Sequence, residues 1–594
     1  MIDIAKLRSD MSKTIILGSH PGIIQSILDY DFLCKRQVPS VVAIIANGRK
    51  QERYFWGDME IAIPVIGSVD QLKQSTKEDC TALLNVQSAR RVLTSTKEAV
   101  ECLPNVRAVT IFAEQTPEAH TLELAEYLKE KAILVAGPSS VGLLLPGYLK
   151  LGAIGGTQHK QLIDADILDA GDIAVISTSG GIVNELIHTV TKAGHHISFA
   201  LALGGDRFPL TTPASAMLLA EADSQTKRIV YFGELGGEDE YEIAKLIKEK
   251  KLTKEIVAYI AGTVAELFEN PPQFGHAKAL AQTQDESASA KKAMLRENGV
   301  IVCDTFGGIA NELKLRDPKK IKDATKPPAI GVRQKSLITS RISGDKHRDV
   351  QLLGNDLLAT VTDNSSASLI LSMLLGKQVR SEKAEAFTDY VFRLLVDHGP
   401  YVSGALNTIV TARAGKDLVS SLVAGLLTIG PRFGGAINAA AEGWLNGVSA
   451  RLAPREFVEL PRSNGIIAGI GHKKYRLDLP DPRVKALMQF ANNKNGDRYL
   501  AFALEIEKVT TTKKANLILN VDGVIAAILL DILESELEYD TEQLKELVDI
   551  EFFNALFVLS RSVGFTAHYL DQRRYDEGLL RLPDEMVTYF DELS

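Results

Sequence analysis

The sequence predicts a multidomain protein in which two doubly wound α/β domains precede an all-α region. Its 594 residues are too many for a single hydrophobic core. Short apolar runs alternate with helical stretches through the first half, and long helical stretches dominate from about residue 365 onward. We expect domains at residues 1–160 and 161–325, a linker or stalk at 326–370, and a helical module at 371–594.

The first domain is predicted from five apolar runs, each ending in a polar or glycine turn. Continuous apolar runs of this length are typical of parallel strands buried on both faces of a sheet. The intervening stretch at residues 116–132 has helical periodicity. In such a domain, ligands bind at the carboxyl ends of the strands. The five runs are 14–18, 41–46, 81–87, 108–114 and 132–138.

Five further strand-like runs predict the second α/β domain. Four of them close in a double glycine or in Gly-Gly-Asp, so their turns allow the backbone to approach a ligand closely. The runs are 173–181, 199–206, 229–237, 256–262 and 300–308. The charged, proline-bearing segment RDPKKIKDATKPP that follows is typical of a linker.

Composition limits the classes of partner and compartment. The formal net charge is −8 and there is no long basic block, so we expect no nucleic-acid partner. The four cysteines are scattered without C-x-x-C spacing, which argues against a disulfide framework or zinc ribbon, favours a reducing cytoplasm and predicts no metal site. No apolar run reaches membrane-spanning length, so no membrane association is expected.

Two glycine-bearing turns of the second domain lead from a strand into a helix. One carries His276 in QFGHAKA, and the other carries Gly180 and Gly181 in STSGGIVNEL. Helix N-termini stabilise anions, so two of them converging on one imidazole would stabilise a phosphoryl group attached to it. A capping or packing histidine is the alternative for His276.

These motifs resemble the alpha subunit of the succinyl-CoA synthetase family, through GELGGEDEYE, the turn at 179–181 and GHAKA. In that family the histidine of a GHAGA motif is phosphorylated and passes the group to a carboxylate. Lys278 stands here in the second glycine position of that motif. The resemblance assigns Glu234 and Glu114 to positions beside His276, where a carboxylate would fix the tautomer of the nucleophilic ring. Solvated loop charges are the alternative for both glutamates.

The opening of the first domain resembles the CoA-binding Rossmann-like domain of the same family, and the second domain its flavodoxin-like ligase domain. In LGSHPGIIQSILDYD, the residues Gly18, Ser19 and Gly22 lie where the resemblance places a CoA phosphate. A tight connection without a ligand is the alternative, but the first strand-to-helix turn of a doubly wound domain is a common binding position.

The last third resembles citrate synthase in the order and surroundings of its polar residues. The resemblance implies a catalytic set of His398, His472 and Asp522, with capping or buried hydrogen bonding as the alternatives. Arginines at matching positions would grip carboxylates bidentately, with surface ion pairing as the alternative. Lys513 and Lys514 would contact CoA phosphate, or form a solvated pair. The arginines are Arg483, Arg561 and Arg581.

Together the two halves resemble the ATP-citrate lyase family along nearly the whole chain. That resemblance implies conversion of citrate, CoA and ATP into acetyl-CoA, oxaloacetate, ADP and phosphate. His276 would relay the phosphoryl group, and citryl-CoA would be cleaved in a retro-Claisen reaction. His472 is assigned to the substrate hydroxyl, His398 to the thioester oxygen and Asp522 to protonation of the methylene carbon. Leu406 departs from the histidine expected in many relatives.

The chain holds no candidate for the ATP-grasp domain that the family requires. The resemblance therefore implies a separate ATP-grasp beta subunit carrying ATP and Mg²⁺, with the citrate site shared between Gly180–Gly181 and that partner. We also expect homo-oligomerisation through residues 370–594, as a tetramer core of an α4β4 assembly. The competing hypothesis is an acyl-CoA ligase alpha subunit whose helical module serves only in assembly.

Overall fold

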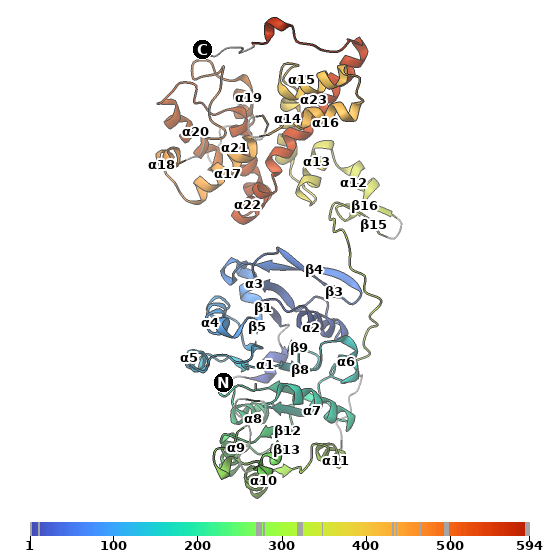
Figure 1. Cartoon of the computed structure of the whole chain (residues 1–594), viewed down its shortest axis with the longest axis vertical. Coiled ribbons are helices and arrows are strands. Elements are labelled where there is room, and N and C mark those ends of the chain that lie inside the picture. The colour runs from blue at the N-terminus through green and yellow to red at the C-terminus, as the bar shows by residue number, and fades with distance from the viewer. Residues whose placement is uncertain are drawn as a thin grey trace. The chain divides into compact units, whose positions relative to one another are not determined.

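The computed structural model forms two compact units, Met1–Leu337 and Ile338–Ser594. Figure 1 colours them from blue to green and from yellow to red, and each is described by itself. The residues described are 3–9, 12–268, 276, 280–317, 325–346, 349–430, 433–434, 436–461, 465–491 and 498–588.

The first sheet of unit 1 has seven strands in the order β3-β4-β2-β1-β5-β6-β7. It is parallel except for the hairpin of β3 and β4 at one edge. All five predicted apolar runs form strands of this sheet. Its strands are β1 Lys13–Leu17, β2 Val41–Ile45, β3 Gln51–Trp56, β4 Met59–Ile66, β5 Cys80–Asn85, β6 Ala108–Ile111 and β7 Leu134–Ala136, with helices α1 Ile4–Ser9, α2 Pro21–Leu33, α3 Gln74–Asp79, α4 Val92–Cys102 and α5 Glu118–Leu128.

The second sheet has the order β14-β13-β12-β10-β11-β8-β9. The strands β10 to β14 run parallel, whereas β8 and β9 form an antiparallel hairpin on β11. This hairpin precedes the predicted boundary at residue 160 but belongs to the second sheet. The strands are β8 Gly142–Leu145, β9 Leu149–Gly152, β10 Ile173–Ser177, β11 Ile197–Ala202, β12 Arg228–Glu234, β13 Glu255–Ala261 and β14 Ile301–Val302, with helices α6 His159–Asp164, α7 Gly180–Lys192, α8 Pro213–Ala222, α9 Asp239–Lys248, α10 Ala288–Glu297 and α11 Gly308–Lys314.

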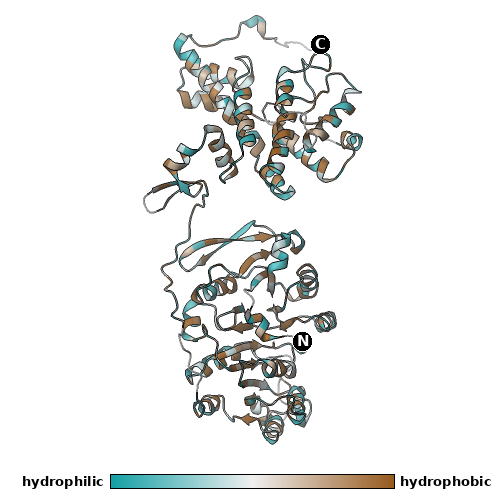
Figure 2. Cartoon of the chain, turned by 180° about the vertical axis from the view of Figure 1, so that it is seen from behind, coloured by the Kyte–Doolittle hydropathy of each residue, from teal (hydrophilic) through white to brown (hydrophobic). Residues whose placement is uncertain are grey.

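Both sheets are apolar on the two faces that helices cover. The central strand β10 is buried at every residue, as expected for a parallel strand between two helical layers. In Figure 2 the strands are largely brown, whereas teal is concentrated on loops and on the outer surfaces of helices. The two-sheet α/β fold predicted from the sequence is therefore confirmed.

Residues 325–337, predicted to belong to a linker, are held against unit 1 by side chains. Arg333 Nε donates to the carbonyl oxygen of Gly57 at 2.9 Å, and its Nη1 donates to Asp29 Oδ2 at 3.2 Å. Nearby, Arg53 Nη1 donates to the carbonyl oxygen of Ser336 at 2.7 Å. Asp29 is buried, so the Arg333 cation compensates a charge that burial would otherwise make costly.

Unit 2 is helical apart from a small three-stranded antiparallel sheet at its start, which confirms the predicted all-α module. Helix α21 is its central element, because every residue from Gly523 to Leu533 is buried. The strands are β15 Ser343–Lys346, β16 Asp349–Leu352 and β17 Asn355–Asp356, and the helices are α12 Leu357–Asp363, α13 Ser366–Leu375, α14 Glu382–Leu395, α15 Ser403–Arg413, α16 Leu418–Leu426, α17 Ala436–Ser449, α18 Pro454–Glu459, α19 Pro482–Phe490, α20 Arg498–Thr511, α21 Val521–Ser535, α22 Thr541–Asp549 and α23 Phe552–Tyr575.

A helix can cross a membrane only if it is both long and apolar enough. No helix in the described parts of the chain combines the length and the apolar character needed to cross a bilayer.

We predict that Arg333→Ala releases residues 325–337 from unit 1, because it removes the hydrogen bonds to Asp29 and Gly57. Thermolysin should then cleave beside the exposed Leu337 and Ile338 faster than in the wild type. Lys335→Ala, which changes an exposed neighbouring cation, is the control and should leave the cleavage rate unchanged. Equal cleavage of Arg333→Ala and wild type would show that the segment is held by other contacts.

Candidate functional site

His276 is hydrogen-bonded to Glu234 at the carboxyl end of β12. Its Nδ1 lies 2.9 Å from Glu234 Oε1 and 3.0 Å from Oε2, so both carboxylate oxygens face one ring nitrogen. A carboxylate only accepts hydrogen bonds, so the hydrogen belongs on Nδ1. This leaves Nε2 as the ring nitrogen with a lone pair when the imidazole is neutral.

A cavity of about 360 Å³ surrounds this ring. Gly180 and Gly181 line it from the N-terminus of α7, and the cap residue Ser179 does not bond the first-turn N–H groups through its side chain. Helix N-termini favour bound anions through these N–H groups and the helix dipole. The structure thus brings His276 to the same cavity as Gly180 and Gly181, and Glu114 also lines that cavity.

The charges around His276 raise its pKa above the ordinary value. The hydrogen bond to Glu234 contributes most; partial burial opposes it, and the charges of Glu234, Glu114 and Asp206 add to the increase. The ring is therefore protonated to a higher pH than a free imidazole. Nucleophilic attack by Nε2 requires the neutral ring, and so a pH above this raised pKa.

Asp206 is a residue of this site that sequence reasoning did not assign. Its carboxylate accepts hydrogen bonds from the backbone N–H groups of Gln115 and Thr116, at 3.3 Å and 3.2 Å. These bonds hold the loop that carries Glu114. The neighbouring Gly205 lies against the imidazole, since a Cβ there would be 2.8 Å from His276 Cδ2. The sequence signal that could have identified Asp206 is the Gly-Gly-Asp that follows β11.

Lys278 lies outside the described residues.

The predicted CoA turn follows β1. Gly18 has a φ of +85°, and Gly22 lies in the first turn of α2. The hydroxyl of Ser19 donates to Glu52 Oε2 at 2.9 Å, so a carboxylate rather than a phosphate is its partner. A cavity of about 560 Å³ opens beside this turn at the carboxyl ends of β1, β2 and β5. Two arginines that the sequence analysis did not assign, Arg90 and Arg91, line it.

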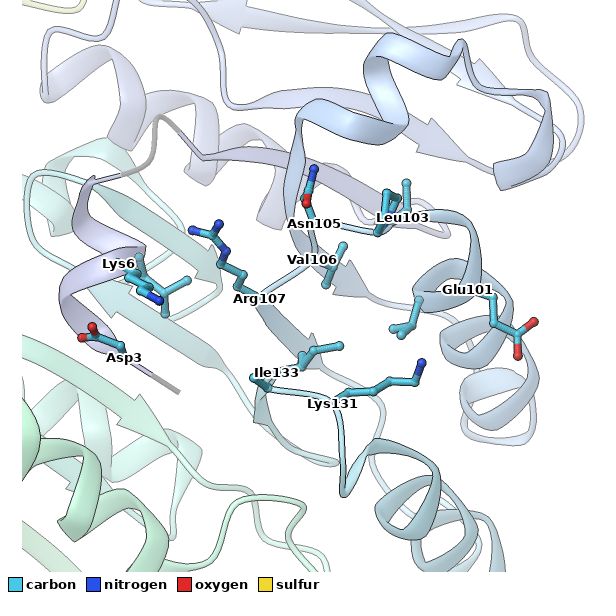
Figure 3. Close-up of a pocket in the computed structure, with 13 residues that line it drawn as sticks. Asp3, Lys6, Glu101, Leu103, Asn105, Val106, Arg107, Lys131 and Ile133 are labelled. Carbon is cyan, nitrogen blue, oxygen red and sulfur yellow. The ribbon is translucent and has the colours of Figure 1, made fainter. Parts of the chain in front are cut away.

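Another cavity of unit 1, of about 630 Å³, lies at the opposite edge of the first sheet. Figure 3 shows Lys6, Arg107 and Lys131 among the residues around it. They precede or flank the amino ends of β6 and β7, whereas ligands of doubly wound sheets bind at the carboxyl ends. None of the predicted site residues lines this cavity, and we assign it no role.

In unit 2, backbone hydrogen bonds bring His472 next to the start of α21. His472 N donates to the carbonyl oxygen of Asn516 at 3.0 Å, and Gly471 N donates to that of Ile518 at 2.7 Å. Asn520 caps α21 by accepting from the N–H groups of Asp522 and Gly523. Two segments about 50 residues apart in the sequence are thereby joined at the position of Asp522.

The tautomer of His472 is set by the backbone. Its Nδ1 accepts hydrogen bonds from the N–H groups of Lys474 and Tyr475, both at 3.0 Å. The neutral ring therefore carries its hydrogen on Nε2, which lies 3.9 Å from Asp481 Oδ2. Desolvation lowers the pKa of His472, and the charge of Arg483 lowers it further, whereas Asp481 opposes the change.

Arg483 is held by Asp481, a buried carboxylate that sequence reasoning did not assign. Arg483 Nη2 and Nε donate to its two oxygens at 2.7 Å and 3.1 Å. Arg561 of α23 is also buried, and its Nε and Nη1 have no hydrogen-bond partner among the described residues. A buried guanidinium with unpaired donors is costly, and acceptor oxygens of a bound ligand would offset that cost.

His398 and Asp522 share the electrostatic environment of these arginines. Desolvation lowers the pKa of His398, and the positive charges of Arg483 and Arg561 lower it further, so the ring is neutral at pH 7. Burial raises the pKa of the Asp522 carboxyl, and the same two arginines oppose that shift. One cluster of unit 2 thus combines His398, His472, Asp522, Arg483 and Arg561.

The remaining predicted residues are not joined to this cluster in the described part of the chain. Arg581 is exposed beyond the end of α23, and Lys513 and Lys514 are exposed beyond the end of α20. Leu406 is a partly exposed residue of α15. No group of histidine, cysteine, aspartate and glutamate side chains within the described ranges is arranged to hold a metal ion.

Comparisons with known proteins match both units. The family described as citrate synthase, C-terminal domain, matches residues 336–582, and the family described as CoA-ligase matches residues 176–301. The probable ATP-citrate synthase subunit 1 of Neurospora crassa is 38% identical over 98% of this chain and 90% of its own length. The ATP-citrate synthase of Mus musculus is 36% identical over 98% of this chain and 55% of its own length.

Solved structures align over the same extent. ATP citrate lyase from Methanothrix soehngenii, in complex with citrate and coenzyme A, is 34% identical, with a TM-score of 0.52 over 99% of this chain and 98% of its own. A mutant of Methanosaeta concilii ATP citrate lyase, in complex with (3S)-citryl-CoA, aligns with the same identity and TM-score.

These relatives correct one prediction from the sequence. The expectation of a separate ATP-grasp beta subunit, and of the α4β4 assembly that includes it, is wrong. The fungal, mouse and archaeal relatives are single chains aligned with 98% or 99% of this one, so no separate beta subunit is needed. In the mouse relative the matched segment is 55% of one longer polypeptide.

We predict that Glu234→Gln lowers the pKa of His276, because it removes the negative charge and the charged acceptor at Nδ1. The free energy that this pair contributes to folding is fully present below the unfolded pKa and is lost as pH rises through the higher folded pKa. NMR titration of the His276 ring, assigned with His276→Ala, measures the shift. Glu114→Gln removes only a nearby charge and should lower the pKa of His276 by less than Glu234→Gln does. A larger effect of Glu114→Gln would contradict the hydrogen bond between Glu234 and His276.

Proposed function

Because the chain belongs to the ATP-citrate synthase family of enzymes, we propose that it makes citryl-CoA from citrate and CoA using ATP, and then cleaves it to acetyl-CoA and oxaloacetate. The observation that carries this proposal is that each unit holds its own set of reactive groups. Unit 1 has an imidazole paired with a carboxylate at a helix N-terminus, and unit 2 has two imidazoles, an aspartate and a buried arginine with unpaired donors.

In the first step, Nε2 of His276 accepts the γ-phosphoryl group of ATP. The N–H groups at the start of α7, beside Gly180 and Gly181, stabilise the phosphoryl oxygens, and Glu234 accepts the hydrogen of Nδ1. A citrate carboxylate oxygen then attacks phosphorus and Nε2 leaves, giving citryl phosphate. The CoA thiolate attacks the citryl carbonyl carbon, phosphate leaves, and citryl-CoA results.

We place CoA for this step at the first strand-to-helix turn, formed by Gly18, Ser19 and Gly22. The adjoining cavity supports the assignment, because Arg90 and Arg91 provide positive charge for the CoA phosphates. The hydrogen bond from Ser19 to Glu52 must break for the Ser19 hydroxyl to contact a phosphate.

In the second step, unit 2 cleaves the bond between the acetyl methylene and the hydroxyl-bearing carbon of citryl-CoA. As this bond breaks, the hydroxyl proton passes to solvent water and the hydroxyl oxygen becomes the ketone oxygen of oxaloacetate, which accepts a hydrogen bond from His472 Nε2–H. His398 stabilises the thioester oxygen as enolate charge develops. Asp522 delivers a proton to the methylene carbon, for which its raised pKa is suited. Arg483 and Arg561 hold the remaining carboxylates. We further propose that Arg581 contacts a substrate carboxylate, and that Lys513 and Lys514 contact a CoA phosphate.

We predict that His276→Ala abolishes ATP-dependent phosphorylation of the enzyme but leaves cleavage of supplied citryl-CoA intact, because the two sets of groups belong to different units. Radiolabel from ATP and acetyl-CoA release measure the two reactions. His188→Ala, which changes an exposed histidine of α7, should affect neither. Loss of citryl-CoA cleavage in a folded His276→Ala enzyme would contradict the proposal that the two reactions use separate groups in the two units.

We predict that Asp522→Asn slows citryl-CoA cleavage by about 10²–10⁴-fold, the usual contribution of a general acid or base. The ligase reaction should continue, so citryl-CoA should accumulate in the presence of ATP, citrate and CoA, as detected by mass spectrometry. Asp540→Asn is the matched control, since asparagine caps a helix as well as aspartate and α22 lies outside the cluster. Normal acetyl-CoA production by Asp522→Asn would favour the competing hypothesis that the helical module serves only in assembly.

A further inference from the structure

The loop that carries Glu234 is held by a fully buried lysine, Lys291 of α10. Its Nζ donates to the backbone carbonyl oxygens of Glu234 and Gly236, at 3.0 Å and 2.7 Å. The third hydrogen bond goes to Glu240 Oε2 at 2.6 Å. An ammonium group has three hydrogens, so each has a partner.

Glu240 and a glycine complete the arrangement. Glu240 lies in the first turn of α9, is 2% exposed, and accepts a hydrogen bond from the Tyr231 hydroxyl at 2.8 Å. A Cβ at Gly233 would lie 2.3 Å from Glu240 Oε1, so only glycine fits before Glu234. The GELGG motif thus leaves room for a buried carboxylate that pairs with Lys291.

Stability alone does not account for this pair. A buried ion pair is often no more stabilising than apolar side chains of similar volume, because both charges lose their hydration. Here two of the three hydrogen bonds go to the backbone at the end of β12, where Glu234 leaves the strand. That backbone directs the Glu234 carboxylate, both of whose oxygens lie within 3.0 Å of His276 Nδ1.

We propose that Lys291 is a positioning residue for the His276–Glu234 pair, fixing the backbone of residues 234–236 so that the carboxylate orients the imidazole for phosphoryl transfer. The inference rests on the proposed function of His276. Lys291 acts through the backbone of Glu234 and touches neither the imidazole nor the cavity.

The groups that face His276 come from three strand ends. They are Glu234 after β12, Glu114 after β6 and Asp206 after β11. Substitution of Lys291 leaves Glu114 and Asp206 with their own hydrogen bonds and charges. Loss of the Lys291 charge and the unpaired charge of Glu240 would by themselves raise the pKa of His276, so a fall in that pKa on substitution of Lys291 is transmitted through Glu234.

The test compares Lys291→Met with Glu234→Gln in the full chain. NMR titration of the His276 ring should show that Lys291→Met lowers its pKa by more than half of the shift that Glu234→Gln produces. Phosphorylation of Nε2 by phosphoramidate, a small donor that requires no nucleotide site, should slow by roughly 10-fold or more at alkaline pH, where the ring is neutral in every variant.

Two further variants separate positioning from a general loss of structure. Lys291→Met leaves the buried Glu240 charge unpaired, so Lys291→Met/Glu240→Gln removes that charge while keeping an acceptor for Tyr231. Lys150→Met is the matched control, because Lys150 is equally buried and its Nζ donates to Ser26 Oγ and the Gly152 carbonyl oxygen, both at 2.7 Å. It should leave the titration of His276 unchanged.

A wild-type His276 pKa and phosphorylation rate in the folded double variant would overturn the inference. The inference would also be overturned if Lys150→Met shifted the pKa of His276 as much as Lys291→Met does. Loss of any buried lysine would then have the same effect. If the wild-type enzyme is not phosphorylated from ATP at His276, the proposed function fails instead, and the pKa comparison still decides whether Lys291 positions Glu234.

Discussion

The hydrogen bond between His276 Nδ1 and the Glu234 carboxylate joins a loop residue to the end of β12, and the geometry of the unit 1 site follows from it. It leaves Nε2 with the lone pair of the neutral ring, and that ring lines the same cavity as Gly180 and Gly181 at the start of α7. It also raises the pKa of the ring, so at a given pH a smaller share of the imidazole is neutral than in a free histidine. In the proposed reaction, Nδ1 keeps its hydrogen once Nε2 carries a phosphoryl group, and Glu234 remains its acceptor.

The cluster of unit 2 uses imidazole in the opposite way. His472 Nδ1 accepts from two backbone N–H groups instead of donating to a carboxylate, and desolvation lowers the pKa of both His472 and His398. These rings are neutral at pH 7, and in the proposed cleavage they act on substrate oxygens as hydrogen-bond donors. One chain thus holds an imidazole kept basic by a carboxylate and two kept neutral by burial and positive charge.

The two arginines of the unit 2 cluster differ in their hydrogen bonding. Arg483 is paired with Asp481, whereas buried Arg561 has two nitrogens without a partner among the described residues. The unpaired donors of Arg561 support the proposed carboxylate substrate more strongly than the paired donors of Arg483 do. Burial costs these unpaired N–H groups their hydration, and a bound ligand would supply the missing acceptors. In the proposed function, substrate binding offsets this desolvation cost.

The sequence alone determined the elements whose signal is local. Each apolar run of the first half became a strand, because burial on both faces of a parallel sheet requires continuous apolar residues. The sequence analysis did not predict the edge hairpins at 51–66 and 142–152. Polar residues of the first face solvent, and the second consists of two buried four-residue strands separated by a turn. Motif resemblance indicated His276, Glu234, His472 and Asp522, whose neighbours in the sequence are distinctive.

Only the tertiary structure showed which polar groups meet. Lys291 has no distinctive local pattern, and the groups that Asp206 and Lys291 bond belong to segments far from them in the sequence. The sequence also could not show that the Ser19 hydroxyl bonds Glu52, or that two donors of Arg561 are buried without partners among the described residues. Such contacts depend on how sheets and helices pack, since the energy of a buried charge is set by the groups around it and not by its neighbours in the chain.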